Sequence, residues 1–286
     1  MKTYRQMIGE LNICMRTNMW KALFSFLLMS ILETLIMSVF SMPVFMLLSE
    51  DGSVILTLIL AVMSLFCGFV FVMLLQYGYQ VLLLRLVRKE YVTLGFLFNG
   101  FRERNRISKA CALVSFGLII ALAVCQVFAV VANIKFSAQI QKMTLPVLAG
   151  IILAVYAFIS ILLLIRFVFV FVCLNDNPQM KIIAVFRLSA SLLKKRCIRL
   201  AGFVLYAGGT HLLIAAAIFI AMLFIPAKLD GMKGFLVSIL EFVYFIAAYT
   251  AAVRMFMAVP LFYTNVVQKT EPPETPAQIA APEVLL

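Results

Sequence analysis

The sequence predicts an all-α membrane protein, a polytopic transmembrane bundle of six helices with amphipathic interfacial helices on the cytoplasmic side. Three observations predict this fold class. Hydrophobic residues make up 65% of the 286 residues and charged residues only 13%, whereas soluble domains are about half apolar. Six apolar stretches each reach the ~20 residues that a bilayer crossing needs. Basic residues are concentrated in alternate connections between those stretches.

The six predicted spans follow one another from the first apolar stretch to the last. The first span is far longer than a signal-peptide core, and no A-x-A-like site closes it, so we expect it to remain in the mature protein as a signal-anchor helix. The spans are Trp20–Leu48, Val54–Leu84, Ala110–Ile134, Leu145–Leu174, Leu200–Ile225 and Phe235–Val259.

Basic residues distinguish the two sides of the predicted bundle. The N-terminal segment, the second and fourth connections and the tail carry 18 Lys and Arg residues, and the other connections carry 4. Under the positive-inside rule, the side with 18 is cytoplasmic, so both termini face the cytoplasm. The net charge of +12 then reflects topology and attraction to anionic inner-leaflet lipid. We therefore expect anionic headgroups as partners, and not nucleic acid.

A weaker pattern recurs with a period near 90 residues. Apolar stripes at helical spacing begin at Tyr4, Leu94 and Ile182, which are 90 and 88 residues apart, and a basic cluster follows each stripe. We interpret the unit as an amphipathic helix, a basic hinge and a two-span hairpin, used three times within a membrane domain of residues 1–265. The alternative is that short stripes and basic inner loops coincide by chance. The units cover about residues 1–88, 89–178 and 179–265.

Two placements are open for the amphipathic helices. They lie in the inner interface with the apolar face toward lipid, or they pack under the bundle as a lid. The first placement predicts that the basic clusters contact lipid headgroups. The candidate headgroup contacts are Arg104, Arg106, Lys109, Lys194, Lys195, Arg196 and Arg199. Residues 266–286 are rich in Pro and Glu, so we expect a disordered cytoplasmic tail.

Ionisable residues inside spans are costly and are candidates for function. The candidate intramembrane polar site consists of Glu33, Arg166, His211 and Arg254; Glu241 lies near an outer end and is expected to reach water. Glu33 and Arg254 either pair with each other and hold spans 1 and 6 together, or line a polar path. His211 is interpreted as a packing histidine after Gly208-Gly209, a predicted close helix contact.

No catalytic triad, P-loop or zinc motif is present, so we predict that the chain is not an enzyme and has no cofactor. The six cysteines lie far apart, without C-x-x-C spacing, and are interpreted as packing residues. An Asn-Asp-Asn-Pro turn at Asn175–Pro178 is expected to cap the next helix, because Asn and Asp side chains cap helices and proline fits the first turn.

Short motifs carry a family resemblance. They are Leu84–Glu90, Phe96–Phe101, Asn175–Pro178 and Leu261–Tyr263. Over about residues 15–265 the chain resembles a bacterial six-span integral membrane family of unknown function, which is similar to the membrane domain of glycerophosphodiester phosphodiesterases. The resemblance implies a fold and a setting in the bacterial cytoplasmic membrane. It implies no activity, because the phosphodiesterase barrel and the Ser-Phe-x-x-Trp of span 5 are missing.

The function predicted first is that of a non-enzymatic, lipid-facing accessory or scaffold protein. The alternative is a small-solute or lipid transporter that uses Glu33, Arg254 and His211. An enzyme acting on lipid headgroups is a third hypothesis, but it lacks a recognisable catalytic set. A water-accessible chamber that reaches Arg254 would favour transport, and a dry bundle would favour the scaffold.

Overall fold

The computed structural model describes residues 2–46, 54–102, 105–117, 169–194, 196–223 and 232–267. These ranges contain helices and no strand, so the all-α class is confirmed for the described part of the chain. In chain order the helices are α1 (Tyr4–Met46), α2 (Val54–Val87), the 3-10 helix η1 (Leu94–Phe98), α3 (Asn99–Arg102), a helix over 105–117, α6 (Val170–Asp176), α7 (Ile182–Leu193), α8 (Cys197–Leu223) and α9 (Met232–Val267).

Four of the described helices are long and apolar enough to cross a membrane: α1, α2, α8 and α9. They coincide with the predicted first, second, fifth and sixth spans. The predicted third and fourth spans, Ala110–Ile134 and Leu145–Leu174, lie mostly outside the described residues. The helix over 105–117 contains the start of the third, and α6 contains the end of the fourth.

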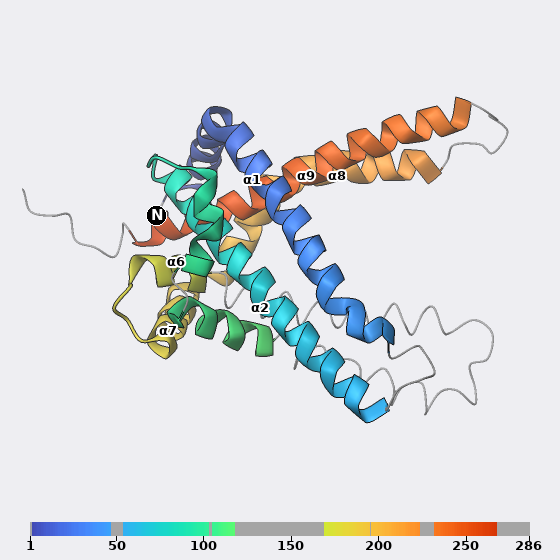
Figure 1. Cartoon of the computed structure of the whole chain (residues 1–286). Helices are drawn as coiled ribbons and strands as arrows, with labels where there is room; N and C mark the ends of the chain where they lie inside the picture. Colours follow the sequence, from blue (N-terminus) through green and yellow to red (C-terminus); the bar gives the residue numbers. More distant parts are fainter. Residues whose placement is uncertain are drawn as a thin grey trace, which may run out of the picture.

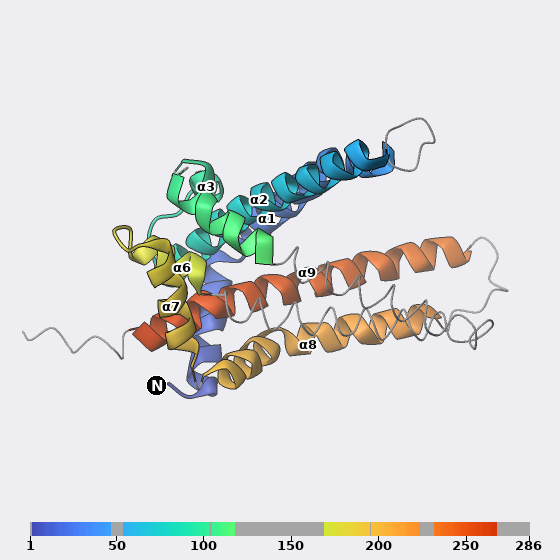
Figure 2. The same ribbon diagram turned by 90° about the horizontal axis from the view of Figure 1, so that it is seen from below.

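The long helices form two antiparallel hairpins. In two perpendicular views α1 lies beside α2 and α8 beside α9, and the hairpins diverge toward their far ends (Figures 1 and 2). We call the end where they converge the inner end, because it carries the basic segments predicted to be cytoplasmic. At this end lie the N-termini of α1 and α8 and the C-termini of α2 and α9.

Helix α1 is bent near its inner end. It has 43 residues, about 64 Å at 1.5 Å per residue, which is twice the hydrocarbon thickness. Asn18 has non-helical backbone angles, φ −124° and ψ 17°, and it lies within the basic cluster Arg16–Lys21. A second break lies between the end of α7 at Leu193 and the start of α8 at Cys197. Both breaks coincide with predicted basic hinges.

The most densely buried part of the described chain is the inner end. Buried runs occupy Val81–Leu84 of α2 and Met257–Tyr263 of α9, whereas the outer halves of the long helices expose many large apolar side chains. Phe169, just before α6, packs on Phe262 and Tyr263 of α9 with ring centroids 6.3 and 5.5 Å away. The core therefore joins the inner ends of three helices that are distant in sequence.

Two glycines allow η1 and α3 to dock closely on α2. A Cβ atom on Gly78 of α2 would lie 1.9 Å from the carbonyl oxygen of Leu97, and one on Gly100 of α3 would lie 2.3 Å from the carbonyl oxygen of Leu74. Both distances are far below van der Waals contact, so no other residue fits without backbone movement. Above η1, the Arg85 guanidinium lies 4.2 Å from the Phe96 ring centroid. The Phe96–Phe101 motif is thus a docking element.

The predicted apolar stripes face protein in the first and third segments. Met7 and Leu11 of α1 are completely buried and Met15 nearly so, and in α7 the buried positions are Val185, Ser189 and Leu193. The second stripe is mixed. Its Leu97 is completely buried, but Leu94 and Phe98 are exposed. Of the two placements that the stripes left open, this burial matches the lid packed under the bundle.

Candidate functional site

The inner end carries a two-pronged ion pair between segments 88 residues apart. Arg88 follows α2 and Asp176 ends α6. The Arg88 Nη1 and Nη2 atoms donate to the two carboxylate oxygens of Asp176 at 2.9 and 2.6 Å. Both side chains are largely shielded, with exposed fractions of 33% and 17%. The hydrogen bond to Asp176 raises the pKa of the Arg88 guanidinium, which stays charged in any case.

Tyr263 of α9 completes this cluster. Its side chain is nearly fully buried, and its hydroxyl lies beside Asp176 and Cys173 of α6. The ends of α2, α6 and α9 therefore meet at one polar point below the apolar core. Such a partly buried charge pair holds the ends of α2 and α6 together, because separating the partners would leave each charge poorly solvated.

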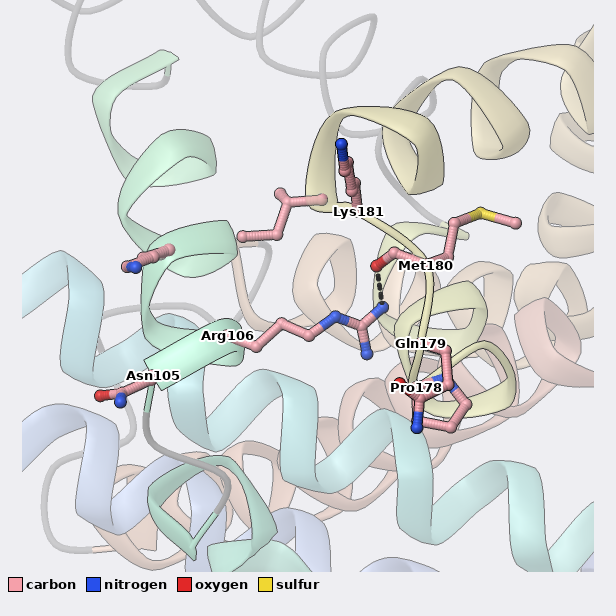
Figure 3. Close-up of a pocket in the computed structure, with 8 residues that line it drawn as sticks. Asn105, Arg106, Pro178, Gln179, Met180 and Lys181 are labelled. Carbon is pink, nitrogen blue, oxygen red and sulfur yellow. Dashed lines mark hydrogen bonds between the residues drawn. The ribbon is translucent and has the colours of Figure 1, made fainter.

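Arg106 ties the helix over 105–117 to the turn between α6 and α7. Its guanidinium donates to the backbone carbonyls of Leu174, Asn177 and Met180 at 3.3, 2.6 and 2.8 Å; Figure 3 shows the side chain reaching across to Met180. These carbonyls are neutral, and no ion pair joins Arg106 to a described carboxylate. Arg106 was predicted to contact lipid headgroups, but its guanidinium binds protein.

A third set of contacts joins the N-terminal residues of the chain to the start of α8. Arg199 of α8 donates to the Lys2 carbonyl at 3.1 Å, and its guanidinium lies 5.6 Å from the centroid of the Tyr4 ring. The Tyr4 hydroxyl returns a 3.0 Å hydrogen bond to the Arg199 carbonyl, and its ring stacks on Phe203. Arg199 is therefore also engaged by protein.

The remaining predicted headgroup contacts differ in their surroundings. Lys109 and Lys194 are exposed and Arg196 is partly exposed, and none of the three has an ion pair or side-chain hydrogen bond to a described residue. Arg104 and Lys195 lie outside the described residues. Of the seven predicted headgroup contacts, Lys109, Lys194 and Arg196 are therefore the described side chains that remain available to bind lipid.

Glu33 and Arg254 do not pair with each other, so of the two arrangements that the sequence left open, the ion pair between spans 1 and 6 is wrong. The Glu33 carboxylate accepts a 2.6 Å hydrogen bond from the Gln76 amide of α2. Arg254 donates to the Ala207 carbonyl at 2.8 Å and to the Asn12 side chain at 2.7 Å. Asn12 lies 21 residues before Glu33 in α1. Because α1 extends inward to Tyr4 and α9 to Val267, Arg254 lies level with the inner part of α1.

The other candidates of the intramembrane site are not gathered around this pair. The Nδ1 atom of His211 lies 3.2 Å from the Thr210 hydroxyl of the same helix. Gly208 makes the predicted close contact, since a Cβ there would lie 2.7 Å from Met255, but Gly209 has open space around it. Arg166 lies outside the described residues, and Glu241 is exposed as expected.

The Asn-Asp-Asn-Pro turn does not cap α7. Helix α7 begins at Ile182, and its N-cap residue, Lys181, makes no side-chain capping bond. Asp176 instead binds Arg88, and the Asn177 amide donates to the Cys173 carbonyl at 3.1 Å. The predicted cap is wrong because Asn175 and Asp176 belong to the end of α6. The last residue of the turn, Pro178, lies four residues before the start of α7 at Ile182.

Described residues line two cavities at the inner end. One, of about 360 Å³, lies between residues 105–109 and 178–182 (Figure 3). The other, of about 580 Å³, lies between the bend of α1, the end of α2 and the end of α9. Neither is lined by Glu33, His211 or Arg254. Among the described residues, no group of three His, Cys, Asp or Glu side chains could hold a metal ion.

Comparisons of the chain with protein-family models, with curated proteins and with solved structures return no match.

Proposed function

We propose that the chain is a multi-pass protein of the bacterial cytoplasmic membrane with six spans and both termini inside, and that it serves as a non-enzymatic, lipid-facing scaffold with a fixed inner face. The charge bias of the connections supports the orientation, and the motif resemblance supports the bacterial setting. The carrying observation is a ring of arginine contacts at the inner end.

With the predicted unit boundaries, each arginine joins a different pair of units. Arg88 of the first unit binds Asp176 of the second. Arg106 of the second unit binds the Met180 carbonyl of the third, in addition to the Leu174 and Asn177 carbonyls of its own unit. Arg199 of the third unit binds the Lys2 carbonyl of the first. The three contacts thus close a ring around the inner end.

A closed ring favours a scaffold over a transporter that alternates access. Alternating access requires one repeat to rock against another around the central site. On the inner side, such movement would break at least two of the three contacts in the ring at each cycle. A scaffold has no such step, and a fixed inner face presents the same surface to lipid or protein at all times.

The test is the distance between units on the inner side of the reconstituted protein. Spin-labelled unnatural amino acids at Ile13, Tyr91 and Ile198 report one unit each, and these side chains are 64%, 81% and 90% exposed, so labels there disturb no packing. We expect one narrow distance distribution for each pair, unchanged by pH or by sodium, potassium and proton gradients. Two populations that exchange with any of these conditions would contradict the scaffold.

Transport is the second candidate, and one observation favours it. Glu33 and Arg254 lie in candidate spans, yet their side-chain partners among the described residues are neutral groups, namely Gln76, Asn12 and a backbone carbonyl. Charged groups in spans without opposite charges are typical of ion and proton pathways. If the spin-label distances show two populations in the wild type and only one in Glu33→Gln, transport is favoured.

A further inference from the structure

The smaller inner cavity is lined on both sides by positive charge. Arg106 and Lys109 lie on one wall, Lys181 lies on the other, and none of the described residues that line it is acidic. The positive charge of Arg106 has only carbonyl partners, and its Nε atom is buried without a hydrogen-bond partner. Lys109 and Lys181 are exposed and make no ion pair within the described part of the chain. Three cationic side chains therefore border one opening of about 360 Å³, and no acidic residue of the described ranges lines it.

The N-terminus of α7 borders the same cavity. Helix α7 begins at Ile182, which lines the opening, and its N-cap residue, Lys181, makes no side-chain capping bond. A helix N-terminus carries about half a positive charge and is a common anion site. Here the start of α7 adds to the side-chain charges.

The wall opposite Lys109 is held in place by the protein. The Arg106 guanidinium bonds to the carbonyls of Asn177 and Met180, on either side of Pro178 and Gln179. Figure 3 shows Pro178, Gln179 and Met180 along one edge of the opening. The separation of the two walls is therefore set by a charged side chain that is already ordered. A ligand would pay no ordering cost for that residue.

We propose that this cavity binds a phosphate group. A phosphate carries negative charge and several acceptor oxygens, which suit two lysines, a shielded arginine and uncapped N–H groups. The level of the cavity allows two sources. The predicted third span begins at Ala110, about 6 Å along the helix from Arg106, so the opening lies near the expected inner headgroup layer. The phosphate belongs either to a lipid headgroup or to a free anion. The inference rests on the orientation in the proposed function and adds a specific site.

The experiment uses the full-length protein and a matched pair of double variants. Lys109→Gln with Lys181→Gln removes two charges from the cavity and leaves Arg106, which holds the turn, untouched. Lys21→Gln with Lys194→Gln removes two charges from exposed inner positions that do not line it. One arm titrates inorganic phosphate against the protein in an uncharged detergent. The other measures retention of phosphatidylglycerol by native mass spectrometry after exchange from phosphatidylcholine nanodiscs that contain it.

We expect saturable binding in at least one arm, weakened about tenfold or more by the cavity variant and little by the control. Loss in the lipid arm alone identifies a headgroup as the source, and loss in the phosphate arm identifies a free anion. Equal affinity of the two variants in both arms, or no saturable binding by the wild type, would overturn the site. The spin-label distances that test the scaffold do not depend on these lysines, so the two proposals fail separately.

Discussion

Replacing Gly78 by alanine tests the position that leaves the least space for a Cβ atom among the described glycines. The added Cβ would lie 1.9 Å from the Leu97 carbonyl oxygen and 2.5 Å from the carbonyl carbon. Ordinary contact needs more than 3 Å, so η1 must move by about 1 Å or leave α2. Overpacking of this kind costs about 1–3 kcal/mol, and the upper half of that range applies because the obstacle is backbone.

Gly209→Ala in α8 is the matched control, since nothing lies within 4 Å of a Cβ there. Both substitutions gain the same helix propensity, about 0.5–1 kcal/mol, so this term cancels in the comparison. We expect Gly78→Ala to be less stable than Gly209→Ala by about 2–3 kcal/mol. Unfolding by SDS in mixed micelles, followed by circular dichroism, measures the difference. Equal stability of the two variants would refute the docking of η1 on α2.

Three further predictions concern the membrane setting and the polar residues. Trp20, the one tryptophan of the chain, is 77% exposed just beyond the bend of α1. Lipids brominated near the headgroup should therefore quench its fluorescence more than lipids brominated near the end of the acyl chain. The opposite order would show that Trp20 does not lie at the membrane interface. In a cysteine-free background of intact cells, a cysteine at Asp51 should react with an impermeant maleimide and one at Tyr91 only after permeabilisation, and the reverse would invert the topology. Glu33→Gln and Arg254→Gln should change the free energy of unfolding additively, within about 0.5 kcal/mol, because the two side chains have different partners; a larger coupling would restore the ion pair.

Four of the six predicted spans coincide with described helices that are long and apolar enough to cross a membrane, and they could be predicted because apolar length is a local property of the sequence. Predicted boundaries at Val54 and Leu200 lie within a few residues of the helix starts at Val54 and Cys197. The continuation of α1 and α9 at the inner end, beyond the predicted spans, was harder to predict. Residues 4–17 and 260–267 continue α1 and α9 beyond the apolar stretches, since the core at the inner end buries them against other segments.

The polar contacts required information that one sequence does not display. Glu33 and Arg254 both lie within predicted spans, but the level of one span relative to another is not given by either span's own sequence, and α1 and α9 extend inward by different lengths. Gln76 lies in a predicted span but is not ionisable, and Asn12 lies before the first predicted span, so neither belonged to the candidate intramembrane site. The contact between Arg88 and Asp176 could have been predicted from the repeat. Their separation of 88 residues equals one spacing of the predicted repeat, so equivalent helix ends could have been expected to meet.

The most direct test of the fixed inner face is the coupling energy between Arg88 and Asp176 in a double-mutant cycle with alanine. Two charge-assisted hydrogen bonds at 2.9 and 2.6 Å, with side chains 33% and 17% exposed, predict a coupling of about 1–2 kcal/mol after allowance for partial solvent screening. The free energies of unfolding of wild type, both single variants and the double variant in mixed micelles give this value. A coupling near zero would contradict the contact between the first two units, and with it the closed ring on which the scaffold rests.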